Sequence, residues 1–451
     1  MSEEPLDGKV ELVTASPLQG QLFRWTVDKS TRSFRVFVVE PSLFVPDQHA
    51  KIFNAVLTSL LRPEALPEDL YRQQRNISIP EPFDLVTFPE AFLSTDDLVR
   101  TLTQIAEYGS MGCIHVGLRS SKDSNSHLIG TEEFRSIIAQ LSGLSTIVGS
   151  DFAQLNTWLD QQRADDHSNI GCLFLLDAEG KLRICLHPKM VRSGFEVGVV
   201  ADERMTEANL LSLVTLLPDS RKFLTVTIQP IICSDTLQLA VDDPGRRPLD
   251  CLNGDYADVF PDTLPDHIDV VSVTACTPQS VGHDKNGITF RKWHEEFRAT
   301  FERVIKGGAW HRHYHATFIL SNFQEMAAVH DPMSRKTLGG LSGGFIPLPA
   351  PPEKPEAFAE ISMYGKGAQR VDNRWTDPMS PPESDFRSLG YIAQLTPQPS
   401  ADVAARMMGF VITTFPRDAP HFEPGSSLAK FQLRIGRFKD DGTMTFAKGE
   451  T

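Results

Sequence analysis

Short β-rich apolar runs that alternate with stretches of helical spacing constrain the fold of this chain more than any other feature. Phe83–Phe88 is such a run, and Leu98, Leu102 and Ile105 then recur at helical spacing before the next run at Cys113–Leu118. Strands alternating with helices predict a layered α/β domain up to about residue 350. Further strands are expected over 34–39, 223–232, 268–275, 316–320 and 343–347, and helices over 51–61, 131–141, 152–162, 206–217 and 291–305.

A hairpin interrupts the alternation. The runs 171–176 and 182–185 flank Asp177-Ala178-Glu179-Gly180, where the glycine suits a turn position with positive φ. Later, a proline-rich stretch at 347–355 breaks the chain, and beyond it only strands are expected, over 357–363, 388–394, 408–414 and 428–435. We therefore expect one domain over 1–350 and a β-rich C-terminal extension over 351–451.

Composition narrows the functional classes. The net formal charge of −14 disfavours nucleic acid as a main partner, because phosphate binding needs clustered lysine and arginine. No apolar run reaches the ~20 residues of a membrane span, and the acidic N-terminus lacks the apolar segment of a secretory signal. The six cysteines form no Cys-x-x-Cys pair, so mostly buried free thiols in a cytoplasmic protein are expected.

Three expected strands end in chemically reactive side chains. Glu90 follows the strand at 83–88, Lys189 follows the second strand of the hairpin, and Cys233 follows the strand at 223–232. In α/β folds functional groups gather at the carboxyl ends of strands. Taken alone, each residue has a simpler interpretation: Glu90 as a helix cap, Lys189 as a surface amine and Cys233 as a buried structural thiol. Their combination indicates a site.

The segments around these residues resemble the motifs of the nitrilase (carbon–nitrogen hydrolase) superfamily. Asp84-Leu85-Val86-Thr87-Phe88-Pro89-Glu90 is similar to its Glu motif, Asp177-Ala178-Glu179-Gly180 followed by Lys189 to its Lys motif, and Ile231-Ile232-Cys233-Ser234-Asp235 to its Cys motif. Ser321-Asn322 and the segment 340–347 resemble its last motifs. The resemblance covers residues 83–347 and implies a four-layer α-β-β-α sandwich. It departs from the family in a longer gap near 198–220 and in residues 1–80.

The resemblance also implies a mechanism. Cys233 would attack an amide or carbamoyl carbon, Glu90 would act as general base, and Lys189 with the Ser234 backbone N–H would stabilise the oxyanion. Glu196 is the candidate for the family's accessory glutamate. The expected substrate is a small amide-like molecule, because Ser234-Asp235 after the cysteine is similar to amidase-like branches. No cofactor or metal is expected, and homo-oligomers are implied by the family.

Other functions remain open at this point. The departures from the family pattern motivate a second hypothesis, a catalytically inactive binding or sensor module, against which the complete set of Glu90, Lys189 and Cys233 argues. The same thioester would also serve an N-acyltransferase. A zinc site is a weaker alternative, because His311, His313 and His315 would share one face of a strand. The glycine-rich segment 339–344 lacks the lysine of a phosphate-binding loop and indicates a tight turn.

Overall fold

The computed structural model describes the chain in separate stretches. They are residues 18–27, 34–42, 46–61, 83–105, 111–122, 127–177, 179–193, 205–218, 225–239, 265–277, 281–283, 289–291, 312–324, 329–331, 336–338, 342–348, 362–363, 388–394, 403–412, 429–438 and 444–448, with positions 297, 300, 301, 303, 304, 415 and 417.

The larger of two main sheets has the strand order β19-β22-β21-β2-β3-β5-β8-β9. Its middle strands β2, β3 and β5 are parallel, whereas the pairs β5–β8, β8–β9, β2–β21 and β21–β22 are antiparallel. At the end of the path, β19 pairs parallel with β22. The short strand β4 pairs with β5, and β23 pairs with β22. The strands are β2 (Phe34–Pro41), β3 (Leu85–Thr87), β4 (Leu93–Ser94), β5 (Met111–Arg119), β8 (Ile170–Leu176), β9 (Leu182–Pro188), β19 (Ser362–Met363), β21 (Ala405–Ile412), β22 (Ala429–Phe438) and β23 (Met444–Lys448).

The second sheet has the order β1-β10-β11-β12-β15-β18-β20. Strands β11, β12 and β15 are parallel, so their carboxyl ends lie at one edge. The strands are β1 (Gln19–Val27), β10 (Leu210–Pro218), β11 (Val226–Ile232), β12 (Val270–Thr274), β15 (Thr317–Ser321), β18 (Gly343–Leu348) and β20 (Ser388–Gln394). Three two-stranded ladders accompany the main sheets: β6 (Ile129–Gly130) with β7 (His167–Ser168), β13 (Val281–His283) with β14 (Thr289–Arg291), and β16 (Val329–Asp331) with β17 (Lys336–Leu338).

The two sheets face each other across a buried core. Leu85 and Leu173 from the larger sheet pack in the same apolar cluster as Val214 and Val270 from the second. Alternation along a strand sends every second side chain to this inner face. The strands are apolar on both faces because both faces are covered.

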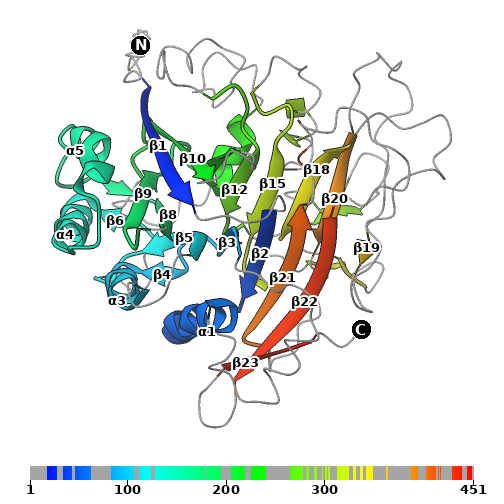
Figure 1. The fold of residues 1–451 in the computed structure, drawn as a ribbon. Coiled ribbons are helices and arrows are strands. Elements are labelled where there is room, and N and C mark those ends of the chain that lie inside the picture. Colours follow the sequence, from blue (N-terminus) through cyan, green and yellow to red (C-terminus); the bar gives the residue numbers. More distant parts are fainter. Residues whose placement is uncertain are drawn as a thin grey trace, which may run out of the picture.

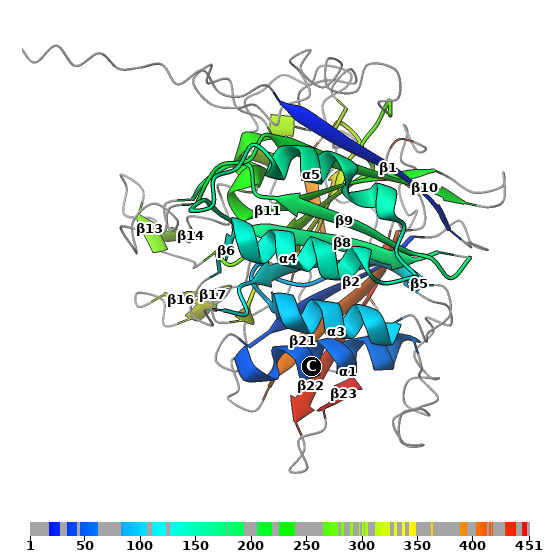
Figure 2. The same cartoon turned by 90° about the vertical axis from the view of Figure 1, so that its left-hand side faces the viewer.

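Helices cover the outer face of the larger sheet, where Figures 1 and 2 show α1, α3, α4 and α5 side by side. On the outer face of the second sheet, helical positions Phe297 and Phe301 pack on the strands, and the Phe301 ring stacks on Phe318 of β15 at 4.0 Å. The helices are α1 (His49–Leu61), α3 (Thr95–Ile105), α4 (Thr131–Ser142) and α5 (Ala153–Leu159), with 3-10 turns η1 (Pro46–Gln48), η3 (Gly149–Phe152) and η4 (Cys233–Gln238).

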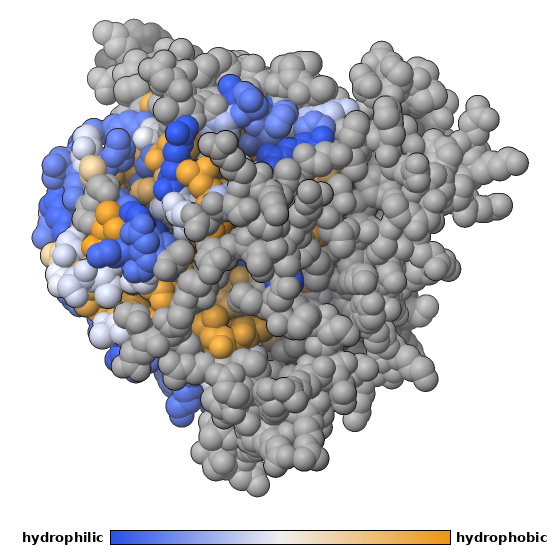
Figure 3. Space-filling model, viewed as in Figure 1, coloured by the Kyte–Doolittle hydropathy of each residue, from blue (hydrophilic) through white to orange (hydrophobic). Residues whose placement is uncertain are grey.

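The surface over α4 and α5 is rich in hydrophilic residues (Figure 3). Figure 3 shows polar residues gathered on the side that carries α4 and α5, where Glu132 and Arg135 of α4 form an ion pair near solvent. None of the helices that the structure describes is long and apolar enough to cross a membrane.

Most predicted elements are confirmed, and the elements expected over 291–305 and 357–363 lie largely outside the described residues. The helix expected over 206–217 is wrong, because Leu210–Pro218 is strand β10, which pairs with β1 and β11. Leu210, Leu213 and Val214 are all buried, because β10 is covered on both faces. A continuous apolar run carries no period that separates strand from helix, so the pattern misled the prediction.

Strands beyond residue 350 continue both main sheets. β20 pairs with β18 in the second sheet, and β21 pairs with β2 in the larger sheet. Within the larger sheet, a buried ion pair between Arg406 of β21 and Glu40 of β2 joins these two strands. The division into 1–350 and 351–451 stays a prediction, but the C-terminal strands that the structure describes are built into the sheets.

Candidate active site

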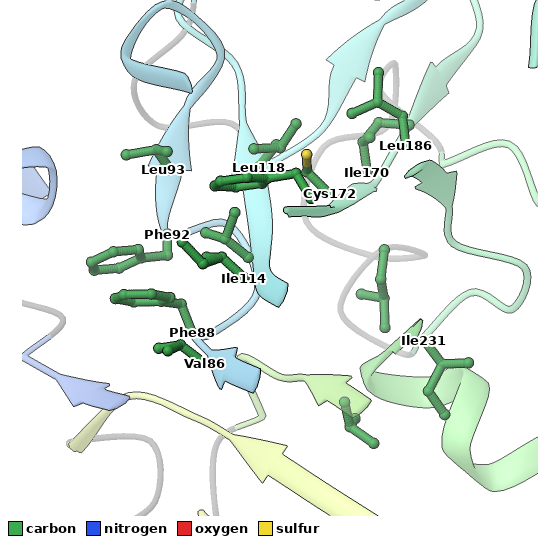
Figure 4. Close-up of a cluster of buried hydrophobic side chains, with 14 of the residues drawn as sticks. Val86, Phe88, Phe92, Leu93, Ile114, Leu118, Ile170, Cys172, Leu186 and Ile231 are labelled. Atoms are coloured by element: carbon green, nitrogen blue, oxygen red, sulfur yellow. The ribbon is translucent and has the colours of Figure 1, made fainter. Parts of the chain in front are cut away.

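Glu90 lies in a tight turn between β3 and β4. The rings of Phe88 and Phe92, on either side of the turn, stack on each other at 5.2 Å and are fully buried (Figure 4). Ala91 has a positive φ of 54°, which reverses the chain between the two rings. The two buried aromatic rings therefore fix the position of the carboxylate.

Strand β5 packs against the same turn through Gly117. A Cβ atom on Gly117 would lie only 2.3 Å from the Cα atom of Glu90. The Gly117 N–H also donates to the carbonyl of Pro89. Glycine is required here because the Glu90 backbone packs directly on the strand.

Both carboxylate oxygens of Glu90 accept hydrogen bonds. Oε1 accepts from Lys189 Nζ at 3.0 Å and from Asn169 Nδ2 at 2.5 Å. Oε2 accepts from the backbone N–H of Cys276 at 2.9 Å. Glu90 is 4% exposed, so the carboxylate is desolvated and its interactions are stronger than they would be in water.

Lys189 follows β9 and its side chain is 1% exposed, ion-paired with Glu90. Its backbone N–H donates to the Asn169 carbonyl, and its carbonyl accepts from Ala208 N–H. A buried ammonium is stable only with such a partner. Glu90 and Lys189 thus form a buried charge pair at the edge of the sheets.

Cys233 begins the turn η4, directly after β11. Its φ of 43° is in the left-handed region, which costs a residue with a Cβ atom about 1–2 kcal/mol. Strain of this kind clusters at functional sites. The thiol Sγ lies 2.8 Å from the Thr277 hydroxyl, in a buried setting.

Thr277 is held in place by the motif at the end of β15. Asn322 donates through Nδ2 to the Thr277 carbonyl and accepts from the Thr277 N–H through Oδ1. The hydroxyl of Ser342, just before β18, accepts from the Asn322 backbone N–H at 3.0 Å. The Ser321-Asn322 motif and the glycine-rich segment therefore support the residue that touches the thiol.

Asp235 ties the cysteine turn to the lysine strand. Its Oδ1 accepts from the N–H groups of Met190 and Val191, and its Oδ2 from that of Ile232. Burial raises the pKa of Asp235 to about 7, although the Lys189 ammonium and the three N–H groups act in the opposite direction. The carboxyl group sets the spacing between the Lys189 and Cys233 segments.

Cys276 is a second thiol at the site with a different character. Burial, helped by the nearby Glu90 carboxylate, raises the pKa of Cys276 to about 12, despite the opposing Lys189 charge. A thiol with so high a pKa is a poor nucleophile at neutral pH. Its contribution is the backbone N–H that binds Glu90.

The three predicted catalytic residues come together in one buried cluster. Glu90 contacts Lys189 directly, and the adjacent residues Cys276 and Thr277 link Glu90 to Cys233. The Ser234 hydroxyl donates to the Val191 carbonyl. The oxyanion role of the Ser234 N–H stays a prediction, and Glu196 lies outside the described residues.

Asn169, Thr277 and Asp235 belong to the cluster, but sequence reasoning assigned none of them a role. Asp235 is part of the Cys motif, so its place near Cys233 could have been predicted from the sequence. Asn169 stands before the hairpin and Thr277 beyond β12, and no spacing in the sequence connects either to the catalytic residues.

The described residues of the histidine segment do not form the strand on which the alternative zinc site depended. Residues 312–315 form a turn before β15, and His311 lies outside the described residues. His313 is buried against Gln229 Oε1, and the His315 ring packs edge-on against His267. Within the described part of the chain, no group of three or more His, Cys, Asp or Glu side chains is arranged to hold a metal ion.

The chain matches no protein-family model and no curated protein sequence. The geometry of the site is therefore the ground for assigning a function.

Proposed function

We propose that this chain is an amidase-like carbon–nitrogen hydrolase with Cys233 as its nucleophile. The observation that carries the proposal is the buried Glu90–Lys189 pair, connected through the Cys276–Thr277 segment to a thiol on a strained backbone. A carboxylate, an ammonium and a thiol in one desolvated cluster supply a base, a cation and a nucleophile.

The reaction begins with transfer of the Cys233 proton to Glu90. The thiolate then attacks the amide carbon, and negative charge develops on the oxygen, where Lys189 and the Ser234 N–H stabilise it. The C–N bond breaks as Glu90 returns the proton to the departing ammonia or amine. A thioester remains on Cys233.

Hydrolysis of the thioester completes the cycle. Glu90 takes a proton from water, the hydroxide attacks the thioester carbon, and the C–S bond breaks as the thiolate leaves. The products are a carboxylic acid and free enzyme, so no cofactor is required. The substrate we propose is a small molecule with an amide or carbamoyl group.

Three further proposals concern the fold type, the cellular location and the oligomeric state. The two facing sheets and their outer helices support a four-layer sandwich of the nitrilase type. A cytoplasmic location is proposed from the free cysteines of the described chain. A homo-oligomeric state is proposed from the resemblance, and light scattering of the purified chain at several concentrations tests it. A concentration-independent monomer mass would contradict it.

The test is release of ammonia or amine from a panel of primary amides, N-carbamoyl amino acids and ω-amides. We expect turnover of part of the panel by wild type and a loss of at least about 10³-fold in Cys233→Ala, Glu90→Gln and Lys189→Met, in line with other covalent catalysts. Cys113→Ala, in the core between the sheets, is the matched control. Product formation only with an added amine would identify an acyltransferase, and binding without turnover would identify a binding module.

A further inference from the structure

Asn169 lies in the short link between β7 and β8 and is completely buried. It contacts both charged members of the site. Its side chain donates to Glu90 Oε1 at 2.5 Å, and its backbone carbonyl accepts from the Lys189 N–H at 2.8 Å. An ionised carboxylate only accepts hydrogen bonds, so the amide nitrogen of Asn169 has to face it.

The hydrogen bonds make the two oxygens of Glu90 different. Each carboxylate oxygen has about two acceptor positions, and Oε1 fills both, with Asn169 Nδ2 and Lys189 Nζ. Oε2 accepts from the N–H of Cys276, whose neighbour Thr277 touches the Cys233 thiol. The oxygen with the remaining acceptor position is therefore the one on the side of the nucleophile.

We propose that Asn169 is a positioning residue that reserves Glu90 Oε2 as the oxygen that takes the Cys233 proton and keeps the carboxylate ionised. This inference rests on the proposed function. Asn169 and Lys189 both donate to Oε1, so rotation of the carboxylate would break two hydrogen bonds. Oε1 therefore cannot exchange places with Oε2 unless both hydrogen bonds are lost.

The amide also controls the proton affinity of the base. A donor to a carboxylate stabilises its ionised form, and Asn169 Nδ2 is one of the two donors to Glu90 Oε1. Removal of the Asn169 amide takes this support away from the form of Glu90 that can accept the Cys233 proton. The acid limb of Cys233 reactivity has to move upward in pH.

The substitutions Asn169→Leu and Asn169→Asp separate this role from simple packing. Leucine keeps the branched heavy-atom arrangement, with bulkier methyl groups, and removes the donor, whereas aspartate keeps the shape but replaces the donor with a carboxyl group beside Glu90. Both keep the backbone carbonyl that binds the Lys189 N–H. Ser168→Ala, one residue earlier and also buried, is the matched control.

The experiment measures the rate of Cys233 alkylation by iodoacetamide from pH 4.5 to 9 by intact-mass spectrometry of the full chain. We expect the acid limb of Asn169→Leu to lie about one pH unit above that of wild type, the size of one hydrogen bond to a charged group. Asn169→Asp should move it at least as far, and Ser168→Ala should leave it in place. Thermal unfolding of each variant reports whether it is folded.

The outcomes distinguish the inference from the proposed function. If wild-type Cys233 reacts no faster than in Glu90→Gln, Glu90 is not its base and both fail. If wild-type reactivity depends on Glu90 but the acid limb of Asn169→Leu does not move, only the role of Asn169 is overturned. If the leucine variant does not fold, an unmoved limb in Asn169→Asp overturns it equally.

Discussion

At the scale of single residues, the hydroxyl of Thr277 sets the environment of the proposed nucleophile. It lies 2.8 Å from Cys233 Sγ, and Asn322 holds its backbone from both sides. A hydroxyl can donate to a thiolate as it forms, which stabilises the charge. The Cys233 thiol therefore contacts a hydrogen-bond donor whose position is set by Asn322.

Thr277→Val removes that donor and nearly preserves the shape. We expect alkylation of Cys233 at pH 7 to slow by about 10-fold, the equivalent of one hydrogen bond of roughly 1.4 kcal/mol. Thr277→Ser, which keeps the hydroxyl, should stay within about threefold of wild type. Equal rates in the valine and serine variants would show that the hydroxyl has no effect on the thiol.

The sequence predicted the proposed catalytic residues better than the residues that support them. Glu90, Lys189 and Cys233 were predictable because each follows a strand, and functional groups in α/β folds gather at the carboxyl ends of strands. Asn169 was not, because its side chain reaches Glu90 from a position 79 residues away along the chain. Long-range side-chain contacts leave no trace in local periodicity.

At the scale of elements, the turn that carries Glu90 depends on its contact with β5. Gly117→Ala would place a Cβ atom 2.3 Å from Glu90 Cα, and its three nearest atoms all belong to the backbone of Glu90 and Ala91, which cannot shift cheaply. We expect a lower free energy of unfolding, by about 2 kcal/mol, and displacement of Glu90. Gly130→Ala, whose Cβ atom would be no closer than 3.6 Å to its neighbours, is the control.

Urea unfolding and Cys233 alkylation of both variants test this prediction. We expect Gly117→Ala to lose both stability and thiol reactivity, and Gly130→Ala to keep both. Wild-type behaviour of Gly117→Ala would mean that the turn does not pack on β5 as described.

Elements were predictable where a period or a cap was present. Ser94 caps α3, since its hydroxyl accepts from the Asp97 N–H and donates to the Asp97 carboxylate. The helix was predictable from the spacing of Leu98, Leu102 and Ile105, which are all buried. The hairpin β8–β9 was equally visible, and Gly180 has the expected positive φ of 72°. β10 was not, because burial on both faces removed its period.

At the scale of the whole molecule, a buried chain of polar side chains connects the two sheets. His115 of β5 contacts Ser272 of β12 through Nδ1 and His187 of β9 through Nε2, and Thr87 of β3 contacts the same serine. Burial lowers the pKa of His187 to about 3, and burial with the His187 charge lowers that of His115 well below its usual value. Both rings are neutral in the folded protein.

These histidines make the fold sensitive to acid. Below pH ~6.5, the unfolded chain binds protons that the folded chain cannot, so the free energy of unfolding falls as pH falls toward the folded pKa of His187 near 3. The slope is up to about 1.4 kcal/mol per pH unit for each histidine. Urea unfolding between pH 7.5 and 5 measures how steeply the free energy of unfolding falls with pH. The slope should be smaller in the double variant His115→Gln/His187→Gln than in wild type. Identical slopes would refute the assignment of the acid sensitivity to these two histidines.

The C-terminal strands contribute to global stability through Arg406. This side chain is 5% exposed and paired with Glu40, which is fully buried on β2. We expect Arg406→Ala to lower the free energy of unfolding by about 3–5 kcal/mol, because it leaves a buried carboxylate without its cation. The double variant Arg406→Met/Glu40→Gln should recover part of the loss. A loss below about 1 kcal/mol in Arg406→Ala would indicate that the pair is exposed to solvent.

The most direct test of the central claim is the identity and rate of the first thiol alkylated at neutral pH. Iodoacetamide treatment followed by intact-mass and peptide mass spectrometry should give one fast adduct on Cys233, slowed in Glu90→Gln and absent in Cys233→Ala. Cys276, with its pKa raised to about 12, should react far more slowly. Slow alkylation spread over several cysteines, or Cys276 labelled before Cys233, would contradict an activated nucleophile at this site.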